Sequence, residues 1–131
     1  MKPLKVGENL TLNMGDFIVI ASGGQLDYGW YCGQGRYGNT LHYYSIWAPG
    51  SALEDYEQYE KGEPIRSWVA ERFKRAGGFN SKCFYKNFLN VYYESRLLKP
   101  GNPDELFTHP EQLERYNKSK EALIRIKFLQ P

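Results

Sequence analysis

The chain has 131 residues, a formal net charge of +2, and 41% hydrophobic against 24% charged residues. This composition is typical of a globular domain and excludes a disordered chain, and the small net charge does not by itself indicate a polyanionic partner. We find no apolar run long enough to cross a membrane and no export signal, so we expect one cytoplasmic domain over residues 1–131, with no membrane partner.

The counts of aromatic residues and cysteines indicate which kinds of surface and site to expect. The chain has 11 Tyr, 7 Phe and 3 Trp, and tyrosine suits half-buried sheets and binding surfaces equally well. Cys32 and Cys83 are too few for a disulfide framework and lack the clustered histidines of a zinc site. We expect two ordinary thiols, with a mutual disulfide as the alternative, and neither a metal nor a cofactor.

The N-terminal third predicts three strands. Residues 17–21, FIVIA, form a continuous apolar run bounded by turn residues, as in a strand that is buried on both faces. A second strand is expected around residues 28–35 and a third over 40–47, both rich in rings. The second and third strands are expected to form a hairpin that turns near Gly38-Asn39.

The middle of the chain predicts a helix. Residues 51–63 hold five acidic residues and one lysine, which we interpret as a solvated loop or a short helix. A helix over 64–76 follows, because Pro64 suits a first turn and Gly77-Gly78 provides a stop. Its apolar residues recur at spacings of three and four, namely Ile65, Trp68, Val69, Phe73 and Ala76.

The remaining third mixes both kinds of element. Residues 88–98, FLNVYYESRLL, read as β-structure, and Thr108-His109-Pro110-Glu111 is a capping box that opens a helix through about Lys118. Alternation over 123–129 predicts a final strand. The whole pattern predicts an α+β fold: a strongly bent antiparallel sheet, or a small SH3-like β-barrel, of about five strands with two helices.

The spacing Gly33-x-Gly35-x-x-Gly38 is also found in nucleotide-binding loops. Such a loop needs a helix after the last glycine to receive the phosphates. Here Gly38 precedes a β-type run, NTLHYYSIW. We therefore expect these glycines to serve the backbone conformation: Gly38 permits a turn, and Gly33 and Gly35 permit a bulge or a close approach of the backbone.

No catalytic residue is recognised. Nucleophilic catalysis requires a base beside the cysteine or serine, and the only histidines are His42 and His109. Nothing local marks Cys32 or Cys83 as activated, and no apolar pocket is predicted around the acidic residues of 51–63. We expect a protein that is not an enzyme.

The leading functional hypothesis is a binding module that engages a protein partner through the aromatic hairpin. Both faces of the hairpin carry rings, and a small domain does not easily hide both. A small inhibitor, a regulator or an assembly subunit of phage or bacterial origin has this profile. The alternative is that the rings are covered. The candidate partner-binding residues are Tyr28, Tyr31, Arg36, Tyr37 and Tyr44.

The second hypothesis is binding of RNA or single-stranded DNA through residues 66–86, which hold six basic residues against Glu71. Basic side chains neutralise phosphates and exposed rings stack on unpaired bases. The helical arrangement weakens the hypothesis, because Arg66, Lys74 and Arg75 are spread around the helix and Arg72 points into its apolar sector. The candidate residues for this function are Lys74, Arg75, Phe79, Lys82 and Lys86.

Overall fold

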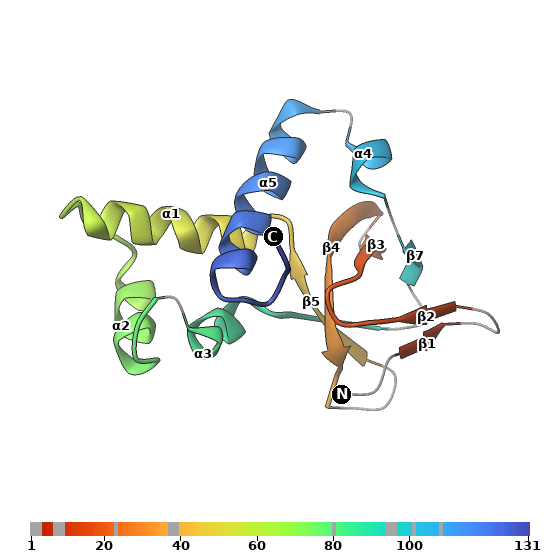
Figure 1. Cartoon of the computed structure of the whole chain (residues 1–131), viewed down its shortest axis with the longest axis horizontal. Coiled ribbons are helices and arrows are strands. Elements are labelled where there is room, and N and C mark those ends of the chain that lie inside the picture. Colours follow the sequence, from red (N-terminus) through yellow and green to blue (C-terminus); the bar gives the residue numbers. More distant parts are fainter. Residues whose placement is uncertain are drawn as a thin grey trace. The chain divides into compact units, whose positions relative to one another are not determined.

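The computed structural model divides the chain into two compact units. The described residues are 4–6, 10–22, 24–36, 40–79, 81–93, 97–100, 102–107 and 109–131. The sheet unit comprises Met1–Ser45 and Leu89–Pro110, and the helical unit comprises Ile46–Phe88 and Glu111–Pro131. Figure 1 labels their elements. Because each unit combines two separate stretches of chain, no single linker in the sequence marks the boundary.

The sheet unit contains a five-stranded antiparallel sheet in the order β6-β5-β4-β3-β7, together with a separate two-stranded hairpin, β1-β2. The expected α+β class is confirmed, as are three strands in the N-terminal third and β-structure within 88–98. The elements of this unit are β1 (Leu4–Val6), β2 (Leu10–Leu12), β3 (Phe17–Ser22), β4 (Gln25–Gln34), β5 (Thr40–Ser45), β6 (Asn90–Tyr93), β7 (Leu97–Pro100) and α4 (Pro103–Leu106).

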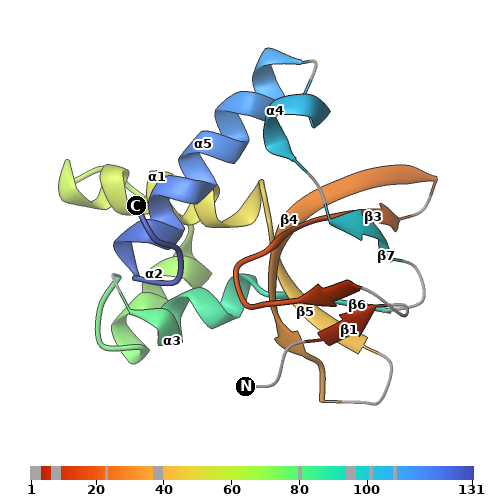
Figure 2. The ribbon, with the colours of Figure 1, turned by 45° about the vertical axis from the view of Figure 1, so that its right-hand side comes forward.

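The five-stranded sheet is bent. Strands β6 and β7 form its two edges, yet only three residues separate Tyr93 from Leu97. A chain of that length spans at most about 14 Å, whereas the edges of a flat five-stranded sheet lie about 19 Å apart. Figure 2 shows β4 curving along its length. The described strands still leave two free edges, so the sheet does not close into a barrel.

Each face of the sheet carries aromatic residues. Tyr31 pairs with Tyr43 and Trp30 with Tyr44, so Tyr31 and Tyr44 project to opposite faces. The candidate partner-binding residues Tyr31 and Tyr44 therefore do not form one surface. On the face of Trp30, Phe17 packs edge-on against that ring with centroids 5.3 Å apart. The other face holds the core cluster of Leu12, Ile18, Ile20, Tyr31, Leu41 and Tyr43.

The glycine pattern serves the hairpin. Gly33 has a φ of 101°, and the β4–β5 register shifts between Tyr31 and Gln34, which is a bulge at a left-handed glycine. At Gly35 an added Cβ would lie 2.0 Å from Thr40 Oγ1. The expected bulge and close approach are confirmed, and the turn expected at Gly38-Asn39 lies outside the described residues.

The helical unit contains more helix than the sequence predicted. Its elements are α1 (Ala48–Glu60), α2 (Ser67–Arg75), α3 (Lys82–Tyr85), the 3-10 helix η1 (Lys86–Phe88) and α5 (Pro110–Arg125). The acidic segment therefore belongs largely to a regular helix, α1, and α2 lies inside the predicted 64–76. The strand expected over 123–129 is wrong, because α5 extends to Arg125 and residues 126–129 form turns and bends.

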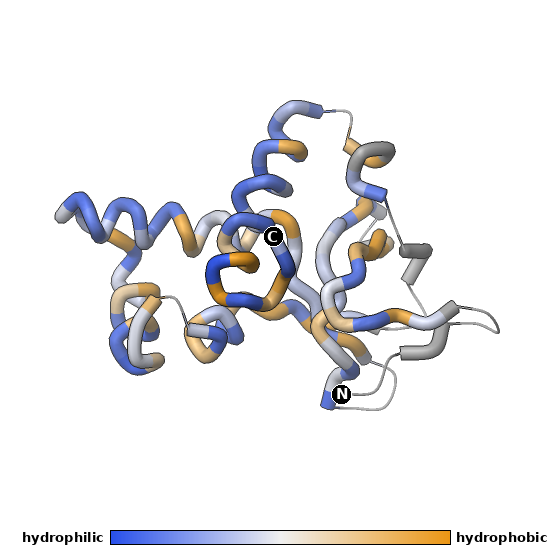
Figure 3. Tube along the Cα trace, in the orientation of Figure 1, coloured by the Kyte–Doolittle hydropathy of each residue, from blue (hydrophilic) through white to orange (hydrophobic). Residues whose placement is uncertain are grey.

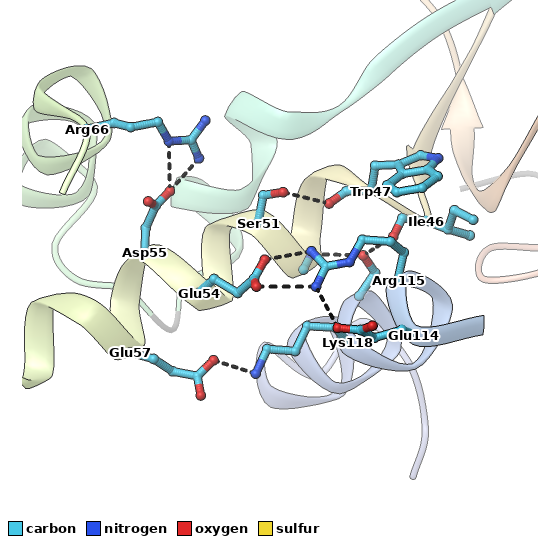
Figure 4. A network of polar contacts seen from close by, with 12 residues as sticks. Ile46, Trp47, Ser51, Glu54, Asp55, Glu57, Arg66, Glu114, Arg115 and Lys118 are labelled. Atoms are coloured by element: carbon cyan, nitrogen blue, oxygen red, sulfur yellow. Dashed lines mark hydrogen bonds and ion pairs between the residues drawn. The ribbon is translucent and has the colours of Figure 1, made fainter. Parts of the chain in front are cut away.

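Polar contacts join α1 to α5 (Figure 4). The hydroxyl of Ser119 is buried, accepts from the backbone N–H of Gly50 at 2.8 Å and donates to the carbonyl oxygen of Ile46 at 2.5 Å. Arg115 forms two hydrogen bonds with Glu54, at 2.6 and 3.2 Å, which lower the pKa of that carboxyl. Hydrophilic residues dominate both helices, with apolar positions at intervals (Figure 3). The acidic face of α1 is thus partly neutralised.

Candidate nucleic-acid interface

The tyrosines of the aromatic hairpin are core residues. The exposed fractions are 8% for Tyr28, 0% for Tyr31 and 3% for Tyr44. Tyr28 packs edge-on against Phe107 with ring centroids 5.1 Å apart. The expected exposure of these three rings was therefore wrong, and the alternative that they are covered holds. Arg36 is exposed. Tyr37 lies outside the described residues.

Two buried phenols in this sheet have structural roles. Tyr43 donates from its Oη to Asp27 Oδ2 at 2.6 Å, and burial together with this bond raises its pKa. Burial also raises the pKa of Tyr44, with a smaller contribution from Cys32. Both phenols stay protonated at neutral pH. The ring of Tyr43 lies against Gly29, where a Cβ would be 2.8 Å from Tyr43 Cδ2.

The basic candidates of the second hypothesis lie on the surface of the helical unit, with one exception among the five. Lys74, Arg75, Lys82 and Lys86 are exposed. Phe79, proposed as a stacking ring, is 4% exposed and stacks on Tyr56 with centroids 4.0 Å apart. Its expected exposure was wrong, because the ring closes an aromatic cluster inside this unit.

An exposed stripe follows one face of α2. Trp68, Arg72 and Arg75 stand at positions i, i+4 and i+7 and therefore share a face. Trp68 is 45% exposed and the side chain of Arg75 is 69% exposed, and Arg72 is exposed too. We call these three residues the α2 stripe. It combines one indole with two guanidinium groups.

The sequence pattern did not reveal the α2 stripe, because it placed both Trp68 and Arg72 in the apolar sector of the helix. The buried residue of α2 is Val69, with Phe73 half-buried. At about 100° per residue, these two lie roughly 100–140° away from Trp68. The signal that reveals the stripe is the i, i+4, i+7 spacing of Trp68, Arg72 and Arg75 itself.

An open hollow of about 170 Å³ lies beside the stripe. It is lined by Arg72, Arg75, Ala76, Cys83 and Asn87, so among the described residues no acidic side chain lines it. Lys82 precedes Cys83 on α3 and Lys86 precedes Asn87 on η1, but neither lysine lines the hollow. The helix α3 is fixed locally by its cap, since the Oγ of Ser81 accepts from the N–H of Phe84 at 3.1 Å. Arg72 and Arg75 therefore make the hollow positively charged on its α2 side.

Trp68 is held by two neighbours. The guanidinium of Arg66 lies over the indole, 5.2 Å from the ring centroid, and the ring of Phe88 lies tilted at 5.7 Å. Arg66 itself donates from Nε to Asp55 Oδ2 at 3.1 Å and forms a second bond from Nη2 to the same oxygen (Figure 4). The carboxylate of Asp55 is buried, at 7% exposure.

No other chemical centre emerges from the described part of the chain. Cys32 and Cys83 form no disulfide with each other, so the alternative of a mutual disulfide was wrong. Over the described ranges, no group of three or more His, Cys, Asp and Glu side chains is placed to bind a metal ion. Within the same ranges, every helix is too short or too polar to cross a bilayer.

Comparison with protein-family models, with curated proteins and with solved structures finds no match to this chain. The function must therefore be argued from the site itself. Guanidinium groups bind phosphates through paired hydrogen bonds. An exposed indole offers a face to an unpaired base. The α2 stripe and the basic residues of α3 bring both chemistries onto one unit.

Proposed function

We propose that the chain is a non-enzymatic binding module for RNA or single-stranded DNA. The observation that carries the proposal is the α2 stripe, which is exposed on one helix face and borders a positively charged hollow. The class of ligand follows from charge, because Arg72 and Arg75 line the hollow and a phosphate backbone complements their guanidinium groups.

The basic side chains of this surface are available to a ligand. Among the described residues, Arg72, Lys74, Lys82 and Lys86 form no ion pair with a carboxylate. Arg75 pairs with Glu71 at 2.7 Å, but both side chains are well exposed. Such a pair contributes about 0.3–0.5 kcal/mol, so a phosphate displaces it at small cost.

Protein binding through the hairpin is the less favoured function. Its tyrosines at 28, 31 and 44 are buried, which leaves Arg36 as the exposed candidate among the described hairpin residues. An exposed arginine supplies neither the aromatic anchor nor the water-excluded pocket that protein hot spots require. The coarse class of the first hypothesis, a binding module, is retained with a different ligand.

We also propose an SH3-like arrangement for the sheet unit. Four consecutive strands, β3 to β6, form a meander, and β7 returns beside β3. This is the connection order of small SH3-like barrels, here left open at the two edges. We further propose a cytoplasmic location, because Cys83 is an exposed thiol and exposed thiols persist in reducing compartments. Neither proposal fixes the ligand, since one fold supports many functions.

The proposal is tested by titrating the chain into a labelled single-stranded oligonucleotide at several salt concentrations, with fluorescence anisotropy as the readout. The Arg72→Gln/Arg75→Gln variant removes two charges from the α2 stripe. Its matched control, Lys61→Gln/Lys127→Asn, removes two exposed charges elsewhere on the helical unit. Asparagine suits position 127 because its φ is 63°.

We expect binding by the parent chain to weaken linearly on logarithmic axes as salt rises. The slope is that of the logarithm of the binding constant against the logarithm of the salt concentration. Each lost phosphate contact makes it shallower by about 0.7, so we expect a decrease of about 1.4 for the arginine variant and a much smaller decrease for the control. Equal losses in the two variants would contradict the assignment to the α2 stripe. Absence of binding by the parent chain at low salt would contradict the function.

A further inference from the structure

We infer that the site recognises an unpaired base stacked on Trp68, and that Asp55 and Arg66 are positioning residues that hold the indole ready for it. The inference rests on the proposed function and narrows it to strands or loops with unstacked bases. It starts from a chain of contacts that runs from the buried carboxylate of Asp55 on α1, through Arg66, to the exposed ring of Trp68 on α2.

The first contact fixes Arg66. A buried carboxylate is costly unless it is paired, and Asp55 is 7% exposed. Its Oδ2 accepts from both Nε and Nη2 of Arg66. Two bonds to one oxygen hold the guanidinium close to that carboxylate. Arg66 also supplies the N-cap position of α2, so its backbone is fixed by the helix that begins after it.

The second contact fixes the indole. Arg66 lies over the ring of Trp68 at 5.2 Å from the centroid, within the range of a cation–π interaction. Phe88, which is almost fully buried, limits the ring on another side at 5.7 Å. Trp68 nevertheless remains 45% exposed. A ring that is already ordered loses less side-chain entropy when a base stacks on it.

The length of the stripe sets the size of the ligand. Trp68 and Arg75 are seven residues apart, which is about 10.5 Å along a helix. Stacked nucleotides of one strand repeat about every 3.4 Å, so the stripe matches roughly three nucleotides. In a duplex each base is paired and stacked on both faces. Arg72 and Arg75 still contact its phosphates, but Trp68 has no free base to receive, so a duplex binds more weakly.

The test compares single-stranded and duplex oligonucleotides of the same sequence, as both RNA and DNA, on the whole chain. Trp68→Ala removes the platform, and Arg66→Lys keeps the charge and the ion pair but replaces the planar guanidinium. Asp55→Asn releases Arg66. Arg125→Lys is the matched control, because Arg125 lies over the ring of Tyr56 at 5.5 Å, far from the stripe in the sequence. Circular dichroism verifies that each variant folds.

We expect the parent chain to prefer single strands. Trp68→Ala reduces that affinity on the order of tenfold, whereas the affinity for the duplex is unchanged. Arg66→Lys and Asp55→Asn reduce single-strand affinity several-fold, and Arg125→Lys leaves it unchanged. Equal binding of single strand and duplex, with no effect of Trp68→Ala, would overturn the inference while leaving the proposed function intact. Failure to bind either ligand would overturn the function itself.

A spectroscopic measurement separates positioning from general stability. The emission of Trp68 is obtained as the difference between the parent chain and Trp68→Phe. Without ligand, we expect iodide to quench this emission more strongly in Arg66→Lys and Asp55→Asn than in Arg125→Lys, because the ring is then less covered. Unchanged quenching in both folded variants would show that Arg66 and Asp55 do not hold the indole.

Discussion

Replacing Ser119 with alanine tests the contact that joins α1 to α5. The hydroxyl is fully buried and serves two backbone groups, the N–H of Gly50 at 2.8 Å and the carbonyl of Ile46 at 2.5 Å. Alanine fills nearly the same volume but satisfies neither group. The substitution therefore leaves one buried donor and one buried acceptor without the partner they have in the native chain.

The expected cost follows from these two groups. Each unsatisfied buried polar group costs about 1–3 kcal/mol, so the loss of both partners in Ser119→Ala is expected to lower the free energy of unfolding by roughly 2–6 kcal/mol. Ser51 provides a matched control on α1. Its hydroxyl donates to the carbonyl of Trp47 at 3.1 Å in an exposed setting, where water replaces the lost bond. Ser51→Ala is expected to cost less than about 0.5 kcal/mol.

The assay is urea denaturation followed by far-ultraviolet circular dichroism, which reports mainly on helix. The urea midpoints of the two serine variants are compared with that of the parent chain. The comparison is one of stability when the dependence of unfolding free energy on urea has the same slope in all three. A midpoint for Ser119→Ala that falls clearly below that of Ser51→Ala supports the reasoning. Indistinguishable midpoints would refute it, because they would mean that Ser119 is not sealed from water between the two helices.

Three further predictions concern stability. Gly29→Ala is expected to lower the free energy of unfolding in urea by about 1–3 kcal/mol or more, because its Cβ would lie 2.2 Å from the carbonyl oxygen of Tyr44; a cost below about 1 kcal/mol would contradict the close strand approach. Tyr43 has a raised pKa, so its share of stability is present below its ordinary value of 10.0 and is lost as pH rises above it. Tyr43→Phe, which also loses the bond to Asp27, should flatten the decline in unfolding free energy above pH 10, and an unchanged decline would contradict this. Glu54 has a lowered pKa, so its contribution to the free energy of unfolding is present above pH 4.5 and is lost as pH falls. Glu54→Gln should therefore lose less stability on acidification than the parent chain, which acid titration of the circular dichroism signal measures.

The strands of the N-terminal third were predictable because their pattern is local and long. Residues 17–21 form an unbroken apolar run, and β4 and β5 alternate rings with smaller residues. Residues 123–129 show where prediction of strands from a local pattern fails. A short alternating run of apolar and basic residues predicts a strand, but α5 extends through residue 125 and residues 126–129 form turns and bends in which Ile126 is buried.

The candidate site was only partly predictable. Charge identified the basic region 66–86, but the role of each ring depended on packing. Phe79 and Trp68 look alike in the sequence, yet Phe79 stacks on Tyr56 inside the unit and Trp68 stays on its surface. The predicted exposure of the hairpin tyrosines was wrong for the same reason. The exposure of a ring is decided by tertiary contacts that no local pattern contains.

The central claim, that a single-stranded nucleic acid binds at the α2 stripe, is tested most directly by a nitrogen–proton correlation spectrum recorded during titration with a single-stranded oligonucleotide. The account predicts that the indole N–H of Trp68 and the backbone amides of Arg72, Arg75 and Cys83 shift together and saturate at one concentration. Shifts confined to the hairpin around Arg36, with α2 unaffected, would contradict it.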